Sequence, residues 1–139
     1  MKNQKIKYCF ALDLKNDPAL INEYIIQHQN VWPEIVDQIK ATGVLSMEIY
    51  QVSDRLFMIM ETTPEFSLTA KRDKDTADPK VQEWETLMAK YQQALPCAKP
   101  GEKWVLMEQI FKLYNLLSRW EHAAMHDYDF VVLGGGITG

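Results

Sequence analysis

The residue types best suited to chemistry lie close together in one stretch of this chain. His28 is the only histidine before residue 122, with Tyr24 four residues before it and Trp32 four after. On one continuous helix the three side chains would share a face. Histidine changes charge near neutral pH and so serves in acid–base catalysis, while aromatic rings pack against the apolar faces of a sugar. The pattern fits either a catalytic histidine in a sugar site or a half-buried core histidine.

Other ionisable residues offer fewer chemical roles. Glu61 and Glu108 have apolar neighbours in their expected strands, and an inward carboxylate there would need a partner; a solvent-facing position fits them equally well. We expect Glu48 to face solvent. His122 and His126 have the spacing of two metal ligands, but no further ligands complete a zinc set, so we expect no metal. No Ser-His-Asp set or nucleophilic Cys-His pair is present.

The elements that must position these residues follow from the periodicity of apolar residues. Pro33 interrupts one helical stretch, so we expect a kink or two consecutive helices there. Between residues 63 and 77 we expect a loop with a short helix. The main elements are a strand over 5–14, helical segments over 18–42, strands over 44–52 and 55–62, a helix over 79–95 and a strand over 103–111.

This order of elements predicts an α+β, ferredoxin-like β-α-β-β-α-β fold. It gives a four-stranded antiparallel sheet with both helices on one face. The other face also carries large apolar residues and needs cover. A second copy of the chain, packed sheet against sheet, is the simplest cover, so we expect a two-fold homodimer.

Composition excludes several classes of protein. Hydrophobic residues make up 47% and charged residues 24% of the 139 residues, which excludes wholesale disorder. The net charge of −4 does not indicate a basic surface that would bind nucleic acid or an anionic membrane. No apolar run approaches the ~20 residues of a membrane span. Two cysteines are too few for a disulfide scaffold. We expect a reduced, soluble, cytoplasmic protein.

The run YIIQHQNVWPEI, over residues 24–35, resembles the signature of the L-rhamnose mutarotase family. Four later runs resemble that family in the same order: GVLSMEIYQV, RLFMIMET, VQEWETLM and EKWVLMEQIF. The similarity covers about residues 5–113. It implies a dimeric α+β barrel that interconverts the α and β anomers of deoxy-L-sugars without a cofactor.

The resemblance also implies roles for single residues. His28 matches the catalytic histidine, the proton donor of the family, and Tyr24 and Trp84 match sugar-binding residues. Glu85 stands where the rhamnose enzymes have a second tryptophan, and Met47 where they have another sugar-contacting tyrosine. These two departures leave the sugar open between L-fucose and L-rhamnose.

For the reaction we expect His28 to protonate the ring oxygen, with Tyr24, Glu108 or water acting at the anomeric hydroxyl. Trp84 should pack on the sugar and Trp32 should help wall the pocket. Two rival functions remain: a non-catalytic sugar-binding module, and a cofactor-free monooxygenase or haem enzyme of the same architecture, in which His28 would ligate iron.

The tail after the ferredoxin-like pattern has a different character. Gly134, Gly136 and Gly139 fit G-x-G-x-x-G directly after the apolar run FVVL, an arrangement that resembles the start of an FAD-dependent oxidoreductase. The helix whose N-terminus would hold the phosphates does not follow. We therefore expect a mutarotase-like domain over 1–113 and a linker or tail over 114–139 that ends in a truncated dinucleotide-binding motif, as in a truncated fusion.

Overall fold

The computed structural model describes residues 4–113 of the chain. All of its helices and strands lie in one compact unit, Met1–Glu108. In chain order they are β1 (Ile6–Leu14), α1 (Pro18–His28), α2 (Pro33–Ala41), β2 (Val44–Val52), β3 (Arg55–Thr62), α3 (Leu68–Ala77), α4 (Pro79–Ala89), β4 (Gln92–Gln93) and β5 (Val105–Leu106).

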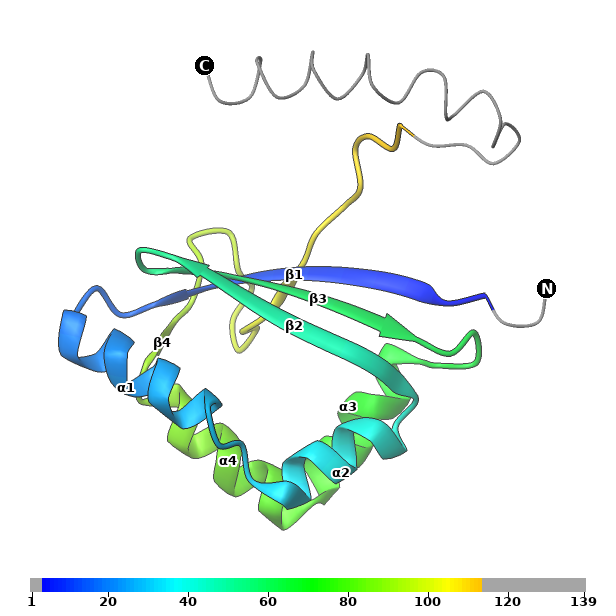
Figure 1. Cartoon of the computed structure of the whole chain (residues 1–139), viewed down its shortest axis with the longest axis horizontal. Helices are drawn as coiled ribbons and strands as arrows, with labels where there is room; N and C mark the ends of the chain where they lie inside the picture. The colour runs from blue at the N-terminus through cyan, green and yellow to red at the C-terminus, as the bar shows by residue number, and fades with distance from the viewer. Residues whose placement is uncertain (1–3, 114–139) are drawn as a thin grey trace. The chain divides into compact units, whose positions relative to one another are not determined.

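The strands form one antiparallel sheet in the order β2-β3-β1-β4, with β5 also pairing with β1. Long strand pairs dominate: Leu12 lies opposite Leu56 in the β1–β3 pair, and Met47 lies opposite Met60 in the β2–β3 pair. The helices lie together on one face of this sheet (Figure 1). The α+β, ferredoxin-like fold class is confirmed.

The core lies between the sheet and the helices because side chains alternate between the two faces of a strand. Leu12 and Leu14 of β1 point to the helix side and are almost fully buried. Helix α4 contributes Val81, Trp84 and Met88 to the same cluster. Each of these apolar side chains gains stability from leaving water, so this layer holds α1 and α4 against the strands.

Local signals in the sequence fix where the helices begin and end. The side chain of Asp17 accepts hydrogen bonds from two backbone N–H groups at the start of α1, and Asp78 does the same for α4. Pro33 begins α2 rather than kinking a single helix, which confirms two consecutive helices. Gly43 ends α2 with φ of +103°, a conformation that favours glycine.

Two expected elements differ from the prediction. The helix expected over 79–95 ends at Ala89, because the buried Tyr91 leaves the helix and its carbonyl accepts a hydrogen bond from the Lys15 N–H at 2.8 Å. This contact starts the short strand β4. The strand expected over 103–111 is reduced to β5, and after it the N–H group of Met107 donates a hydrogen bond to the carbonyl of Cys9 at 2.7 Å.

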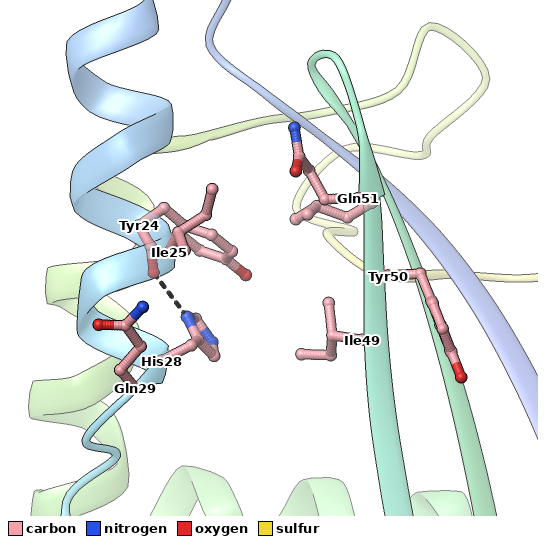
Figure 2. A pocket seen from close by; sticks show the side chains of 8 residues that line it. Tyr24, Ile25, His28, Gln29, Ile49, Tyr50 and Gln51 are labelled. Atoms are coloured by element: carbon pink, nitrogen blue, oxygen red, sulfur yellow. Dashed lines mark hydrogen bonds between the residues drawn. The ribbon is translucent and has the colours of Figure 1, made fainter.

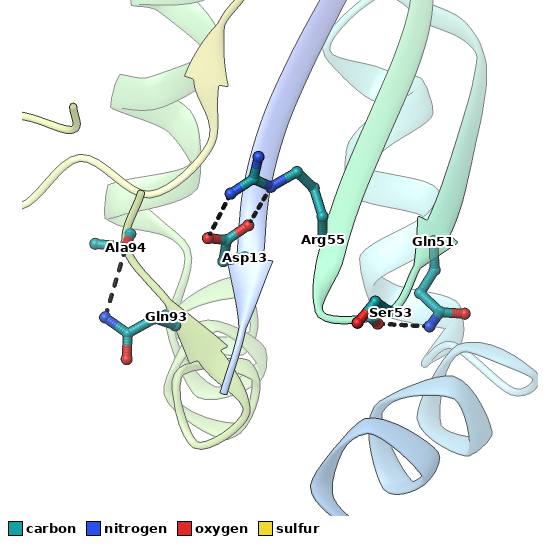
Figure 3. A network of polar contacts seen from close by, with 6 residues as sticks. All are labelled: Asp13, Gln51, Ser53, Arg55, Gln93 and Ala94. Atoms are coloured by element: carbon teal, nitrogen blue, oxygen red, sulfur yellow. Dashed lines mark hydrogen bonds and ion pairs between the residues drawn. The ribbon is translucent and has the colours of Figure 1, made fainter. Parts of the chain in front are cut away.

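The sheet face opposite the helices carries both charged and apolar side chains. Arg55 makes two hydrogen bonds to the carboxylate of Asp13, at 2.7 and 3.1 Å (Figure 3). Tyr50 is 54% exposed and Val52 is 71% exposed on β2. None of the helices in the described part of the chain has the length and apolar character of a membrane-spanning segment. The glycine motif and the two histidines of the tail lie outside the described residues.

Candidate active site

A cavity of about 450 Å³ lies between α1 and the β2–β3 hairpin. This volume falls in the range of small-molecule sites. Tyr24 and His28 reach it from α1, and the side chain of Ile49 reaches it from β2 (Figure 2). The lining residues are Tyr24, Ile25, His28, Gln29, Ile49, Tyr50, Gln51 and Leu56.

Tyr24 is a buried residue with a polar end. Its ring is 3% exposed and packs edge-on against Tyr91, at 5.9 Å between centroids. Its hydroxyl points from α1 toward β2 (Figure 2). Burial raises the pKa of Tyr24 to about 12, a hydrogen bond from the side chain of Gln92 lowers it in part, and the charge of Glu85 raises it further. The phenol therefore stays protonated at neutral pH and can donate a hydrogen bond.

His28 is held by its own helix. Its Nδ1 atom lies 2.9 Å from the backbone carbonyl oxygen of Tyr24, so Nδ1 carries the proton and donates it to this oxygen. In the neutral ring Nε2 is then an acceptor. Burial lowers the pKa of His28, and the hydrogen bond to the carbonyl opposes that shift in part. The resting imidazole is thus neutral, with Nε2 available as a base.

Aromatic rings surround the imidazole. The Tyr24 ring lies 4.4 Å from it, and the ring of Trp84 on α4 lies 5.8 Å from it in an edge arrangement. Trp32 packs edge-on against Trp84 at 5.0 Å. Trp32 belongs to the connection before α2 rather than to α1, and it reaches the group because the chain turns there. The structure therefore brings together four of the predicted site residues.

Trp84 and Trp32 lie behind His28 rather than in the cavity lining. Trp84 is only 8% exposed. In this structure Trp84 restricts the orientation of the imidazole and Trp32 packs against Trp84, roles the sequence does not indicate.

The predicted glutamates lie elsewhere. Glu108 is exposed beyond the end of β5 and is not among the residues that line the cavity. Glu61 lies on the other face of the sheet, 3.9 Å from the Nζ atom of Lys5. Glu48 is exposed, as expected, and accepts a hydrogen bond from Tyr50. A role for Glu108 in the reaction stays a prediction that the geometry does not support.

Sequence reasoning missed several residues of the site. Ile49, Gln51 and Leu56 line the cavity from the hairpin, and Gln92 reaches Tyr24 from β4. None of them is near His28 in the sequence, and only the pairing of the strands brings them there. The register of the hairpin with β1 is the one signal that could have indicated them.

Metal ligation has little support in this region. Among residues 4–113, no group of three or more His, Cys, Asp or Glu side chains is arranged to hold a metal ion. The lining residues offer instead one imidazole, two phenols, two side-chain amides and apolar walls. This set can bind a polar small molecule with apolar patches and can exchange a proton with it.

Comparison with known proteins identifies the family. The model of the L-rhamnose mutarotase family matches residues 7–113. The chain belongs to the L-rhamnose mutarotase family. As a member of that family it is an isomerase of the mutarotase type, and the resemblance seen in the sequence is confirmed for this part of the chain.

Individual members show how the chain relates to this family. A protein named L-fucose mutarotase from Xanthomonas campestris pv. campestris is 40% identical over 114 residues, which cover 81% of this chain and 91% of the relative. A protein named L-rhamnose mutarotase from Brucella anthropi is 30% identical over 82 residues, 58% of this chain and 74% of the relative. The crystal structure of L-rhamnose mutarotase from Formosa agariphila has a TM-score of 0.59 at 19% identity and covers 78% of this chain and 99% of that one, which supports the fold.

Proposed function

We propose that this protein interconverts the α and β anomers of a deoxy-L-sugar, with L-fucose as the preferred substrate. The observation that carries the proposal is a neutral imidazole, fixed through Nδ1, beside a protonated phenol at one cavity. We choose L-fucose because the relative named L-fucose mutarotase is 40% identical to this chain over most of both chains.

Mutarotation requires two proton movements that this site can supply. The anomeric hydroxyl loses its proton to Nε2 of His28 while the bond between C1 and the ring oxygen breaks, its electron pair going to the ring oxygen. The imidazolium then gives that proton to the ring oxygen. The open-chain aldehyde turns about the C1–C2 bond, and the same steps in reverse close the ring on the other face. General acid–base help of this kind is worth about 10²–10⁴-fold.

Tyr24 acts as a hydrogen-bond donor in this scheme. With a pKa of about 12 it holds its proton throughout, and it stabilises the negative charge that develops on the ring oxygen. Ile49 and Leu56 offer apolar walls to the C–H face and the methyl group of a deoxy sugar. The carbonyl of Tyr24 stabilises the imidazolium by accepting the Nδ1 proton.

The test is anomer exchange measured by NMR saturation transfer for L-fucose, L-rhamnose and D-glucose, with and without the protein. We expect faster exchange for L-fucose, less for L-rhamnose and none for D-glucose. Tight sugar binding with no change in exchange would indicate the sugar-binding module instead. No effect on any sugar would contradict the mutarotase function of this chain.

We further propose that the working form is a homodimer joined through the open face of the sheet. Apolar side chains on that face, including Tyr50 and Val52, are exposed in the single chain. The boundary between a mutarotase-like domain over 1–113 and a separate tail stays a prediction, as does a cytoplasmic location.

A further inference from the structure

Gln51 places a side-chain amide on the wall of the cavity that faces His28. It belongs to β2, at one end of the strand order, and lies opposite Leu56 of β3. Both residues line the cavity, together with Ile49 two positions earlier on β2. Because alternate residues of a strand share a face, the side chains of Ile49 and Gln51 both point toward α1 (Figure 2). Gln51 is also exposed, so a ligand in the cavity can reach its amide.

The hairpin turn fixes the orientation of this amide. The Nε2 atom of Gln51 donates a hydrogen bond of 2.7 Å to the backbone carbonyl oxygen of Ser53 (Figure 3). A carbonyl oxygen can only accept, so the amide must present its nitrogen to Ser53, and the reverse orientation would bring two acceptors together. Oε1 is therefore the atom left for a ligand. In Figure 2 this oxygen lies on the side of Ile49, and the nitrogen lies on the far side.

The position of this acceptor relates it to one part of a bound sugar. In the mechanism proposed above, the residues of α1, His28 and Tyr24, act on the C1 hydroxyl and the ring oxygen. In a six-membered sugar ring, C4 lies directly opposite C1. A sugar that lies across the cavity with its anomeric centre at His28 therefore turns its C4 hydroxyl toward β2, where Gln51 offers Oε1. A few polar groups placed in this way fix the orientation of a ligand in an otherwise apolar site.

We propose that Gln51 determines which sugar is bound: its Oε1 atom accepts a hydrogen bond from the C4 hydroxyl of L-fucose. The inference rests on the mutarotase function proposed above and adds a specificity residue to it. L-Fucose and L-rhamnose have opposite configurations at C2 and C4, so the C4 hydroxyl is axial in L-fucose and equatorial in L-rhamnose. An acceptor that the turn holds in one orientation bonds to the axial hydroxyl, and L-rhamnose lacks that bond.

Gln51→Leu tests the proposal by binding alone, because leucine has no polar atom and an exposed position tolerates it. The measurement is Kd by NMR titration with L-fucose, 4-deoxy-L-fucose and 2-deoxy-L-fucose. We expect wild type to bind 4-deoxy-L-fucose about fivefold more weakly than L-fucose, the value of one hydrogen bond. Gln51→Leu should bind L-fucose about fivefold more weakly than wild type and should not distinguish it from 4-deoxy-L-fucose. Loss of the C2 hydroxyl should have the same effect in both proteins.

Gln93→Leu is the matched control. Gln93 is also an exposed glutamine whose Nε2 donates to a backbone carbonyl, that of Ala94 at 3.5 Å, and it is not among the residues that line the cavity. This variant should bind L-fucose as wild type does.

Turnover gives a second readout for Gln51→Leu. KM for L-fucose should rise about fivefold while kcat changes by less than about twofold, because the C4 hydroxyl is bound equally in the ground state and the transition state. The ratio of kcat/KM for L-fucose to that for L-rhamnose should fall by about the same factor of five.

Three results would overturn the role of Gln51. One is an equal Kd for L-fucose in wild type and Gln51→Leu, and another is the absence of L-fucose binding by wild type. The third is a further loss with 4-deoxy-L-fucose in Gln51→Leu, because another residue would then bind the C4 hydroxyl. If the expected binding pattern is found but wild type does not accelerate anomer exchange, the mutarotase function fails while the assignment of Gln51 to the sugar stands.

Discussion

The hydrogen bond from Nδ1 of His28 to the carbonyl oxygen of Tyr24 determines which nitrogen can act on a substrate. A ring free to rotate would offer either nitrogen and would have to be ordered in each turnover. Here the helix backbone orders it beforehand, and Trp84 restricts it from the other side. One fixed Nε2 atom can then take the proton and return it, which suits a reaction whose two directions use the same steps.

Replacement of His28 by glutamine should therefore abolish most turnover and leave the fold intact. Gln lacks a group that titrates near neutrality, so we expect anomer exchange to fall by about 10²-fold or more. The matched control is Asn22→Ala, on the same helix α1, because Asn22 is exposed and is not among the residues that line the cavity. Exchange near the wild-type rate in His28→Gln would refute the assignment.

The lowered pKa of His28 predicts how activity and stability depend on pH. Burial favours the neutral ring, so the acid limb of kcat/KM should have its midpoint below the ordinary value of about 6.5. Above about 6.5 the folded state has its full stability. As the pH falls through the lowered pKa, the unfolded state binds more protons and stability is lost. Urea unfolding of wild type and His28→Gln across pH 4–8 should show this loss in wild type alone.

At the scale of residues, the sequence predicts what lies close together along the chain. Tyr24 and His28 are four positions apart on one helix, and that spacing alone places them side by side. Gln92 and Ile49 come from other elements, and their position depends on strand pairing that no local pattern specifies. In particular, only the folded structure shows that the side-chain oxygen of Gln92 is buried without a hydrogen-bond partner among the described residues.

At the scale of elements, helix α4 positions the site from behind. Its start is fixed by Asp78, whose side chain accepts hydrogen bonds from the N–H groups of Lys80 and Val81 at 2.9 and 3.3 Å. Farther along, Trp84 packs against His28. The same aspartate also follows the end of α3, so one residue sets the junction of two helices.

Asp78→Ala should reduce the free energy of unfolding by about 1 kcal/mol, the usual value of such a cap. We expect kcat to change little below the melting temperature, because the packing of Trp84 is retained in the folded state. Ser67→Ala is the matched control, since Ser67 caps α3, a helix without buried residues. Urea unfolding of both variants checks the expectation; an equal or larger loss in Ser67→Ala would contradict it.

The elements that sequence could predict are those with strong local signals. Two caps followed by proline, at residues 17–18 and 78–79, mark α1 and α4, and the hairpin of β2 and β3 has the expected bounds. The short strands β4 and β5 have none of these signals. The pattern over 103–111 indicates that the segment can form a strand. Whether it pairs depends on the backbone N–H and C=O groups of the neighbouring strand, which the local pattern does not specify.

At the scale of the whole molecule, the helices of the described residues cover one face of the sheet, and no described helix covers the other, open face. Phe57 and Ile59 are half-buried on the open face, where Phe57 lies opposite the exposed Tyr50 of β2 and Ile59 lies opposite Cys9 of β1. Exposed apolar surface of this kind is costly in a single chain. The chemistry of the site lies on the helix side, so a partner on the open face would leave the cavity accessible.

Ile59→Asp should therefore convert a dimer into a monomer. Ile59 lies in the middle of β3, between Cys9 of β1 and Glu48 of β2, where a buried charge would cost several kcal/mol in a sheet-to-sheet interface. Ile26→Asp is the matched control, because Ile26 is 52% exposed on α1 and lies outside the sheet. Sedimentation equilibrium should give twice the chain mass for wild type and Ile26→Asp and the mass of one chain for Ile59→Asp. A wild-type monomer, or a dimer that persists in Ile59→Asp, would show that the open face is not the interface.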